Sequence, residues 1–383
     1  MLLKKKNISA LFLILLCFPF LPILGFFPNS DTGIHVLVLS FSSMFFITKK
    51  IPSYIFIIFS LIIFSTIINV NIELIQYARF INVFIVHFSV FFLTHYLLKT
   101  DHFLLKKSLL IVYSIYIFGA FFQLIFPEIF SSLFSFIRTS SNRGLTSFAS
   151  EPSSLALNCF LILISLKIMG LKSRAFYLNL FLVIILSLNS VILFILISAI
   201  FISTILKIKI KNFIKIMFII LISFVLISKI EFFQSSRVFR NINLLFSNPE
   251  LLLLDSSVNR RISHMIFPIL GFFKGYFILP SFSMTYTKDV FQILSSAYPL
   301  FSGEIGGNVM SGLGQLITNL GIFGLGIFGY IYFKVFKSNK ISLFIKISFF
   351  IIFINSISIS WATFVILISL IFYIDKKNLH WGT

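Results

Sequence analysis

Long runs of apolar residues alternate with short polar segments along almost the whole chain. Each run is long enough, or nearly so, to cross roughly 30 Å of hydrocarbon as a helix. The pattern therefore predicts about twelve transmembrane helices. The predicted spans are 8–27, 33–48, 52–70, 80–98, 108–126, 152–169, 175–188, 190–206, 213–230, 307–333, 341–357 and 360–374. The stretches 175–206 and 341–374 are each too long for one crossing and short for two, so we interpret both as tight hairpins.

Composition supports this interpretation. Hydrophobic residues make up 58% of the 383 positions and charged residues 11%, whereas a soluble domain carries roughly 25% charged residues. We therefore predict an all-α, polytopic membrane protein, with residues 1–383 forming a single integral membrane domain.

The distribution of cations predicts the orientation of these helices. With the N-terminus in the cytoplasm, the inner segments hold 21 cations and two acids, and all twelve spans agree with that orientation. Cytoplasmic loops carry an excess of Lys and Arg. Both termini are thus predicted to be cytoplasmic. The net charge of +20 reflects topology, and we expect no nucleic-acid partner.

Two outer loops are longer than a simple connection requires. The first covers 127–151, and the second covers 231–306, some 76 residues. A loop of that length is usually functional or disordered. Phe, Ile and Leu recur throughout the second loop, which is not the composition of disorder. We predict that it folds onto the membrane surface as interfacial helices.

Arginine and lysine are sorted differently across the predicted membrane. Twenty of the 23 lysines are inside, whereas seven of the eight arginines are outside. The guanidinium fork suits bidentate recognition of phosphate, which lysine binds only as a point charge. The sorting therefore indicates an anionic ligand, although interfacial arginines can also bind lipid headgroups or pair with nearby acids. The candidate ligand-binding residues are Arg138, Arg143, Arg237, Arg240, Arg260 and Arg261.

His264 is a candidate proton acceptor in the second outer loop. It shares one arc of a predicted helix with Arg260 and Arg261, since positions i, i+1 and i+4 lie close together. Two neighbouring cations favour the neutral form of a histidine. Pro268 is expected to end this helix. The alternative interpretation is an amphipathic surface helix with a solvated basic face.

Glu151 is a second candidate, at the end of the first outer loop. Followed by Pro152, it places an acid at the positive end of a helix dipole and a proline in the first turn. That arrangement explains both residues structurally. The functional alternative is a general base held at the membrane surface. Acids are sparse outside, so no metal site is expected.

These motifs resemble a known family. The run from Arg143-Gly144-Leu145 to Glu151-Pro152-Ser153 is similar to the Arg-x-x-Gly-Leu-x-x-Glu-Pro-Ser signature of bacterial O-antigen and exopolysaccharide repeat-unit polymerases (Wzy type). The large outer loop before the last helices also matches that family, as does an arginine followed by ten residues and a glycine, here Arg260 and Gly271. The resemblance extends over the whole chain in architecture, and over about 40 residues in sequence motifs.

The resemblance implies a glycosyltransferase of the bacterial inner membrane. A growing glycan on undecaprenyl pyrophosphate would be transferred to the terminal sugar hydroxyl of a new lipid-linked repeat unit. Outer arginines would bind the pyrophosphate, and Glu151 or His264 would accept the hydroxyl proton. The implied partners are the lipid-linked oligosaccharide, the bilayer and a chain-length regulator protein. No cofactor is implied.

Three alternatives share parts of this pattern. An O-antigen ligase has many helices and one large outer loop. A lipid-linked oligosaccharide flippase has about twelve helices but does not need a 76-residue outer loop. An ion-coupled transporter would place acids at mid-membrane, whereas every Asp and Glu here falls in a loop or at a helix end.

Overall fold

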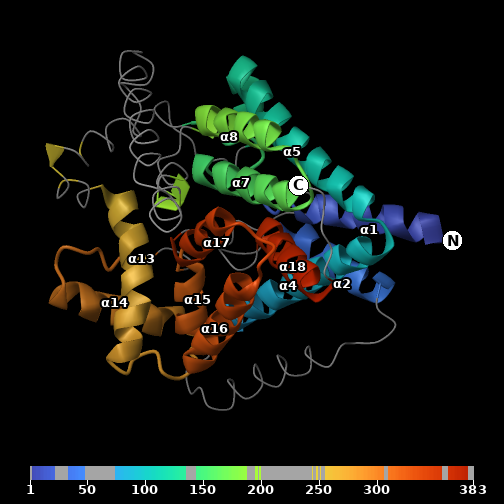
Figure 1. Ribbon diagram of the computed structural model, residues 1–383. Helices are drawn as coiled ribbons and strands as arrows, with labels where there is room; N and C mark the ends of the chain where they lie inside the picture. Colours follow the sequence, from blue (N-terminus) through green and yellow to red (C-terminus); the bar gives the residue numbers. More distant parts are fainter. Residues whose placement is uncertain are drawn as a thin grey trace, which may run out of the picture. The chain divides into compact units, whose positions relative to one another are not determined.

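The computed structural model describes residues 2–21, 33–47, 74–134, 144–187, 255–305, 309–355 and 361–377, with isolated positions between 195 and 251. The elements of secondary structure in these residues are helices, which confirms the all-α prediction. They are α1 (Leu2–Leu16), α2 (Ile34–Ile47), α4 (Leu74–Thr100), α5 (His102–Ile125), α6 (Pro127–Leu133), α7 (Pro152–Ile168), α8 (Ser173–Ser187), α13 (Ser256–Phe273), α14 (Met284–Ala297), α15 (Gly312–Leu320), α16 (Ile322–Lys337), α17 (Leu343–Asn355) and α18 (Ala362–Lys377) (Figure 1).

Among the described residues, two helices are long and apolar enough to cross a membrane, Ile81–Thr100 within α4 and His102–Ile125, which is α5. Five further apolar helices are 10–17 residues long. The predicted spans 52–70 and 213–230, and most of 190–206, lie outside the described residues. The number of spans therefore stays a prediction. The described part of the stretch 341–374 contains two helices, α17 and α18, as expected.

The chain divides into two compact units, each built from segments far apart in the sequence. Unit 1 comprises Met1–Val112, Ser256–Lys340 and Phe353–Thr383, and unit 2 comprises Tyr113–Asp255 and Ile341–Ile352. Unit 1 contains α1, α2, α4, α13 to α16 and α18, and unit 2 contains α6, α7, α8 and most of α17.

At one end of unit 1, helix ends that the charge pattern assigns to the same side contact one another. Lys6 of α1 pairs with Asp101 at the α4–α5 junction (Nζ to Oδ2, 3.7 Å). The Tyr373 hydroxyl of α18 donates to the carbonyl oxygen of Leu98 at 3.2 Å. The start of α1, the end of α4 and the end of α18 thus lie together, as the predicted alternation of the helices requires.

Segments predicted to lie on the opposite side also meet in unit 1. The rings of Phe20, after α1, and Trp361, before α18, form an edge-to-face contact with centroids 6.1 Å apart. The Ser311 hydroxyl donates to the carbonyl oxygen of Ile354. Ser311 caps the N-terminus of α15, where its Oγ accepts the N–H of Gly314.

The predicted span 307–333 is wrong as a single helix, because the chain breaks at Gly321 between α15 and α16. Gly321 has φ +57°, a conformation that L side chains rarely adopt. A Cβ there would collide with the carbonyl of Ile278. The next N–H, of Ile322, donates to that same carbonyl at 3.0 Å. The 278–283 segment thus packs against the break, which hydropathy alone does not reveal.

The first helix is shorter than the predicted span 8–27, because α1 ends at Leu16. Pro19 follows, and proline removes a backbone donor and clashes with the preceding helical turn. The carbonyl oxygen of Pro19 instead accepts the N–H of Gly33 at 2.7 Å.

The prediction that Pro268 ends its helix is also wrong, because α13 continues through it to Phe273. A proline inside a helix leaves the carbonyl four residues earlier, here that of His264, without its helical donor. Gly314 of α15 packs at this place: a Cβ on Gly314 would lie 2.7 Å from that carbonyl oxygen and 3.1 Å from Pro268 Cγ. The absence of a side chain lets α15 pack closely against α13 (Figure 1).

An apolar cluster joins α13, α14 and α15 in unit 1. Its buried members are Phe267, Phe277, Val290, Phe291, Leu294, Val309, Leu313 and Ile317. A fully buried side chain of this size contributes about 1.5–3 kcal/mol. Gly271 is part of the same packing, because the Phe277 ring occupies the position that a Cβ would take. Much of the described part of the large outer loop is therefore a packed helical structure.

In unit 2, α7 is buried along almost its whole length, from Pro152 to Leu166. A helix that is apolar on all sides is a core helix. It lies beside α8 (Figure 1). The Tyr113 hydroxyl of α5 donates to the carbonyl oxygen of Asn179 of α8 at 3.2 Å. The first outer loop contains the short helix α6 and the turn that leads into α7.

Candidate functional site

The turn before α7 is held in place by one glutamine of α5. Gln123 Oε1 accepts the backbone N–H of Thr146 at 2.8 Å and that of Ser147 at 2.9 Å. The Ser147 hydroxyl donates to the carbonyl oxygen of Tyr116 at 2.6 Å. Ser147 has φ +52°, an uncommon conformation for a residue with a side chain. Several hydrogen bonds thus fix a strained turn, an arrangement often found near functional residues.

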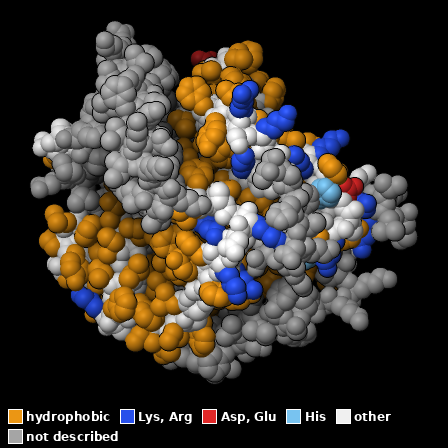
Figure 2. All heavy atoms as spheres, in the orientation of Figure 1, with side chains coloured by type: hydrophobic (Ala, Val, Ile, Leu, Met, Phe, Trp, Pro, Cys, Tyr) orange, Lys and Arg blue, Asp and Glu red, His pale blue; other side chains and the backbone are white. Residues whose placement is uncertain are grey.

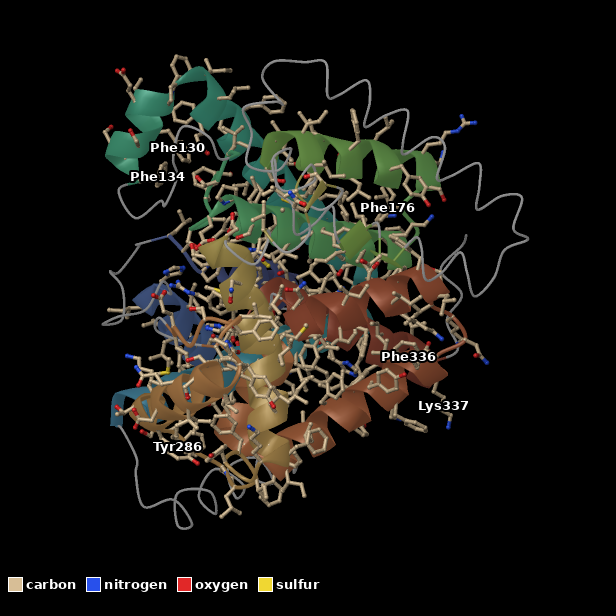
Figure 3. All side chains as sticks on the ribbon, turned by 90° about the vertical axis from the view of Figure 1, so that its left-hand side faces the viewer. Phe130, Phe134, Phe176, Tyr286, Phe336 and Lys337 are labelled. Carbon is tan, nitrogen blue, oxygen red and sulfur yellow. The ribbon has the colours of Figure 1, made fainter. Side chains whose placement is uncertain are left out.

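Aromatic side chains pack against the same turn. The Phe148 ring packs against Phe130 of α6 and Phe134, with centroids 6.0 and 5.3 Å away. Phe130 and Phe134 lie side by side at this end of unit 2 (Figure 3). Gly119 of α5 lies under the turn, because a Cβ there would collide with Ser147 Oγ and the Phe148 ring. The turn therefore has a fixed position on α5.

Glu151 is the N-cap residue of α7, and Pro152 occupies the first turn, as predicted. Its backbone carbonyl accepts the N–H groups of Ser154 and Leu155. Its carboxylate makes no capping bond to the helix. Instead Oε2 accepts the hydroxyl of Ser153 at 3.0 Å. The partly exposed carboxylate thus lies at the positive end of the helix dipole without serving as the cap.

A second polar region lies in unit 1, where side chains of α13 bind the backbone of a segment 40 residues later. We call the described residues of this segment, 298–305 and 309–311, the strap. Asn259 Nδ2 donates to the carbonyl oxygen of Leu300 at 2.8 Å, and its Oδ1 accepts the N–H of Ser302 at 2.7 Å. Gly303 lets the strap pass close to α14, because a Cβ would lie 2.6 Å from Ser295 Oγ.

His264 binds the strap in the same way, one turn further along α13. Its Nδ1 accepts the backbone N–H of Met310 at 2.9 Å, and its Nε2 lies 3.1 Å from the carbonyl oxygen of Glu304. These partners require Nε2 to carry the hydrogen. The side chain is completely buried. Both ring nitrogens are therefore engaged with backbone, which favours a structural role for His264 over proton transfer.

The electrostatic environment of His264 agrees with a neutral imidazole. Burial lowers the pKa of His264 to about 4, the hydrogen bond with the Glu304 carbonyl opposes that shift, and the nearby charge of Arg260 adds to it. The sequence predicted a neutral histidine beside arginines, but burial is the larger cause.

Arg260 forms an ion pair with the strap. Its Nη2 lies 2.6 Å from Glu304 Oε2, with the two side chains 33% and 72% exposed. Its Nε is buried and has no hydrogen-bond partner among the described residues. A buried donor left without an acceptor costs about 1–3 kcal/mol. Arg260 thus has donor capacity that the described part of the chain does not use.

The structure describes only some of the predicted site residues. Arg261 is half-buried on α13 beside Arg260. Arg138, Arg143, Arg237 and Arg240 lie outside the described residues. Arg260 and His264 are brought together with Glu304 in unit 1, whereas Glu151 belongs to unit 2.

Two residues that organise these sites were missed by sequence reasoning. Asn259 directly precedes Arg260 and lies next to the predicted arc of Arg260, Arg261 and His264 on α13. Its polarity and position were the available signal. Gln123 is a single amide near the outer end of an apolar run, and its polarity there was the available signal.

The His264 assignment can be tested by comparing two substitutions. Glutamine can accept one N–H and donate one, so His264→Gln should retain most activity and stability. His264→Leu should lose both, because two backbone groups of the strap would be left without partners. Activity and thermal unfolding of the purified full chain would be measured. Equal loss of activity in both variants, with the His264→Gln protein still folded, would indicate a proton-transfer role.

The pH dependence of stability gives a second readout for the same variant. A pKa of about 4 in the folded protein, against about 6.5 in an unfolded chain, means that the folded state favours the neutral imidazole. The contribution of His264 to the free energy of unfolding is therefore complete above about pH 6.5 and is lost as the pH falls toward 4. His264→Gln should therefore lose less stability than the parent protein over that range.

The polar groups described in the two units suit two kinds of chemistry, proton acceptance and anion binding. Unit 2 offers a partly exposed carboxylate on a fixed backbone. Unit 1 offers a guanidinium with an unused buried donor, paired with an exposed carboxylate. Such groups suit proton acceptance and anion binding. No family model matches the chain, and neither does any curated protein or solved structure in the comparisons.

Proposed function

We propose that the chain polymerises undecaprenyl-pyrophosphate-linked repeat units into O-antigen or a related surface polysaccharide, on the outer face of the bacterial inner membrane. The observation that carries the proposal is the start of α7, where the run that resembles the signature of such polymerases ends in Glu151-Pro152-Ser153. Its carboxylate is oriented by Ser153 and does not cap the helix. It therefore keeps acceptor capacity at the start of α7, at the positive end of the helix dipole.

Exposed apolar side chains support the placement in a membrane. Phe103 and Phe118 of α5 are 71% and 68% exposed, and Leu178 and Phe181 of α8 are 69% and 59% exposed. Hydrophobic side chains cover much of the described surface in Figure 2. Soluble monomers rarely expose large contiguous apolar patches. We infer that lipid covers these faces and that the protein is multi-pass, with both termini cytoplasmic.

The outer placement of the α13 site follows from the same inference. The strap leads directly into Ser311, which contacts Ile354, and both belong to the end of unit 1 opposite Lys6 and Asp101. If lysines mark the cytoplasmic side, Arg260 and Glu304 face outward.

The proposed reaction uses the described residues as follows. The acceptor sugar hydroxyl attacks the anomeric carbon of the growing glycan. A new glycosidic bond forms as the bond between that carbon and the pyrophosphate oxygen breaks. Glu151 takes the proton of the hydroxyl, and arginines of the outer loops stabilise the charge on the departing undecaprenyl pyrophosphate.

Deleting the gene in its source bacterium tests the proposal. Cells should lose long polysaccharide chains but still carry single repeat units on the lipid A core, and a plasmid copy should restore the ladder on gels. A missing ligase would instead leave the core without any repeat unit while polymer accumulates on the lipid carrier. A missing flippase would leave no repeat unit on the outer face. Either of these two results would refute polymerisation.

A further inference from the structure

The pairing of Arg260 with Glu304 occupies only part of the guanidinium. The contact joins one nitrogen, Nη2, to one oxygen, Oε2. The neighbouring Nε is buried and has no hydrogen-bond partner among the described residues. A guanidinium presents its donors as a rigid fork, and Nε with Nη2 forms one edge that can take two oxygens of one anion. Glu304 therefore leaves half of this edge unused.

The strap holds its place without the ion pair. Asn259 and His264 bind the strap through its backbone, at Leu300, Ser302, Glu304 and Met310. The Glu304 side chain itself is 72% exposed. It can therefore turn into solvent while the backbone beneath it stays fixed, so separating it from Arg260 does not require the strap to unfold.

We infer that Glu304 is a displaceable counter-ion, which occupies the Arg260 site until a phosphate group replaces it and thereby sets the affinity of that site. The inference rests on the proposed function, in which Arg260 binds the lipid pyrophosphate. Glu304 is thus an affinity-determining residue and not a proton acceptor.

A phosphate group fits the vacated edge better than a carboxylate in its present position. Two oxygens on one phosphorus reach Nε and Nη2 together, which satisfies the buried donor that Glu304 leaves unsatisfied. A pyrophosphate also brings more negative charge than one carboxylate. The competing ion pair is partly exposed, and pairs of that kind shift an equilibrium by about 1.4- to 5-fold. Displacement by a pyrophosphate is therefore feasible.

Binding of inorganic pyrophosphate to the purified full chain in detergent tests the inference. Glu304→Gln and Glu304→Ala should bind it about two- to fivefold more tightly than the parent protein, because the internal competitor is removed. Arg260→Gln should bind it at least about tenfold more weakly. Asp289→Asn removes an exposed acid of α14 and controls for the change in net charge. It should leave binding unchanged.

The outcomes separate this inference from the proposed function. If Glu304→Gln and Glu304→Ala bind pyrophosphate equally or more weakly than the parent while Arg260→Gln loses it, Glu304 does not compete and the inference is wrong. Equal tightening in Asp289→Asn would attribute the effect to net charge and also overturn it. Unchanged binding in Arg260→Gln would refute the phosphate site on α13 itself. Thermal unfolding of each variant shows whether the strap remains folded.

Discussion

Replacing Glu151 with glutamine should abolish polymer while the protein accumulates normally in the membrane. Glutamine keeps the size of the side chain and its hydrogen bond with Ser153 but cannot take up the acceptor proton. A general base contributes about 10²–10⁴ in rate, so cells should show only single repeat units on the core. The helix-dipole contribution lost with the charge is about 0.3–1 kcal/mol, which a buried helix such as α7 should tolerate.

The experiment needs polysaccharide gels and an immunoblot of the membrane fraction. Glu128→Gln is a matched control, because Glu128 lies in the first turn of α6 after Pro127 and is exposed. It should leave the polymer ladder unchanged. Wild-type polymer from Glu151→Gln would exclude the catalytic role. Loss of polymer together with loss of protein would indicate a structural role at the start of α7.

Replacing Arg260 with lysine should shorten or eliminate polymer, although the positive charge is retained. Lysine keeps a point charge but loses the Nε–Nη2 edge. Hydrogen bonds to charged groups contribute about 1.5–3 kcal/mol each, so losing one should lower activity about ten- to a hundredfold. Arg261→Lys should also impair polymerisation, because Arg261 is among the outer arginines predicted to bind the same ligand.

Arg174→Lys is the control for the arginine substitutions, since Arg174 is exposed near the start of α8 and is predicted to be cytoplasmic. Its polymer should match that of the parent strain in length and amount. Near-normal polymer from both Arg260→Lys and Arg261→Lys would contradict the role of α13 in binding pyrophosphate.

Periodicity and charge were sufficient to predict much of the helical framework. Runs of apolar residues predicted both ends of α2 and α7 to within one residue, because the length of an apolar helix depends on local composition. The helices α4 and α5 each begin six residues before the predicted spans 80–98 and 108–126. The lysines predicted which helix ends lie together in unit 1, as the contacts of Lys6 and Tyr373 show. The helix start at Glu151-Pro152 was also a local signal.

Other features depend on residues far apart in the sequence. The break at Gly321 needs the carbonyl of Ile278, and the passage of α13 through Pro268 accompanies close packing of Gly314 against it. Local propensity allowed a continuous helix through Gly321 and favoured a helix end at Pro268. Packing between segments tens of residues apart instead accompanies a break at Gly321 and a continuous helix through Pro268.

The sequence by itself determined that the chain is helical and strongly apolar, and that its lysines and arginines fall in different loops. These properties depend on residue type and spacing. It also marked Glu151, Arg260 and His264 as candidates. Only the tertiary structure showed which groups these side chains contact. It placed both nitrogens of His264 against backbone and joined Arg260 to Glu304, 44 residues away. Hydrogen bonding and burial depend on which segments meet, and that is decided by packing of the whole unit.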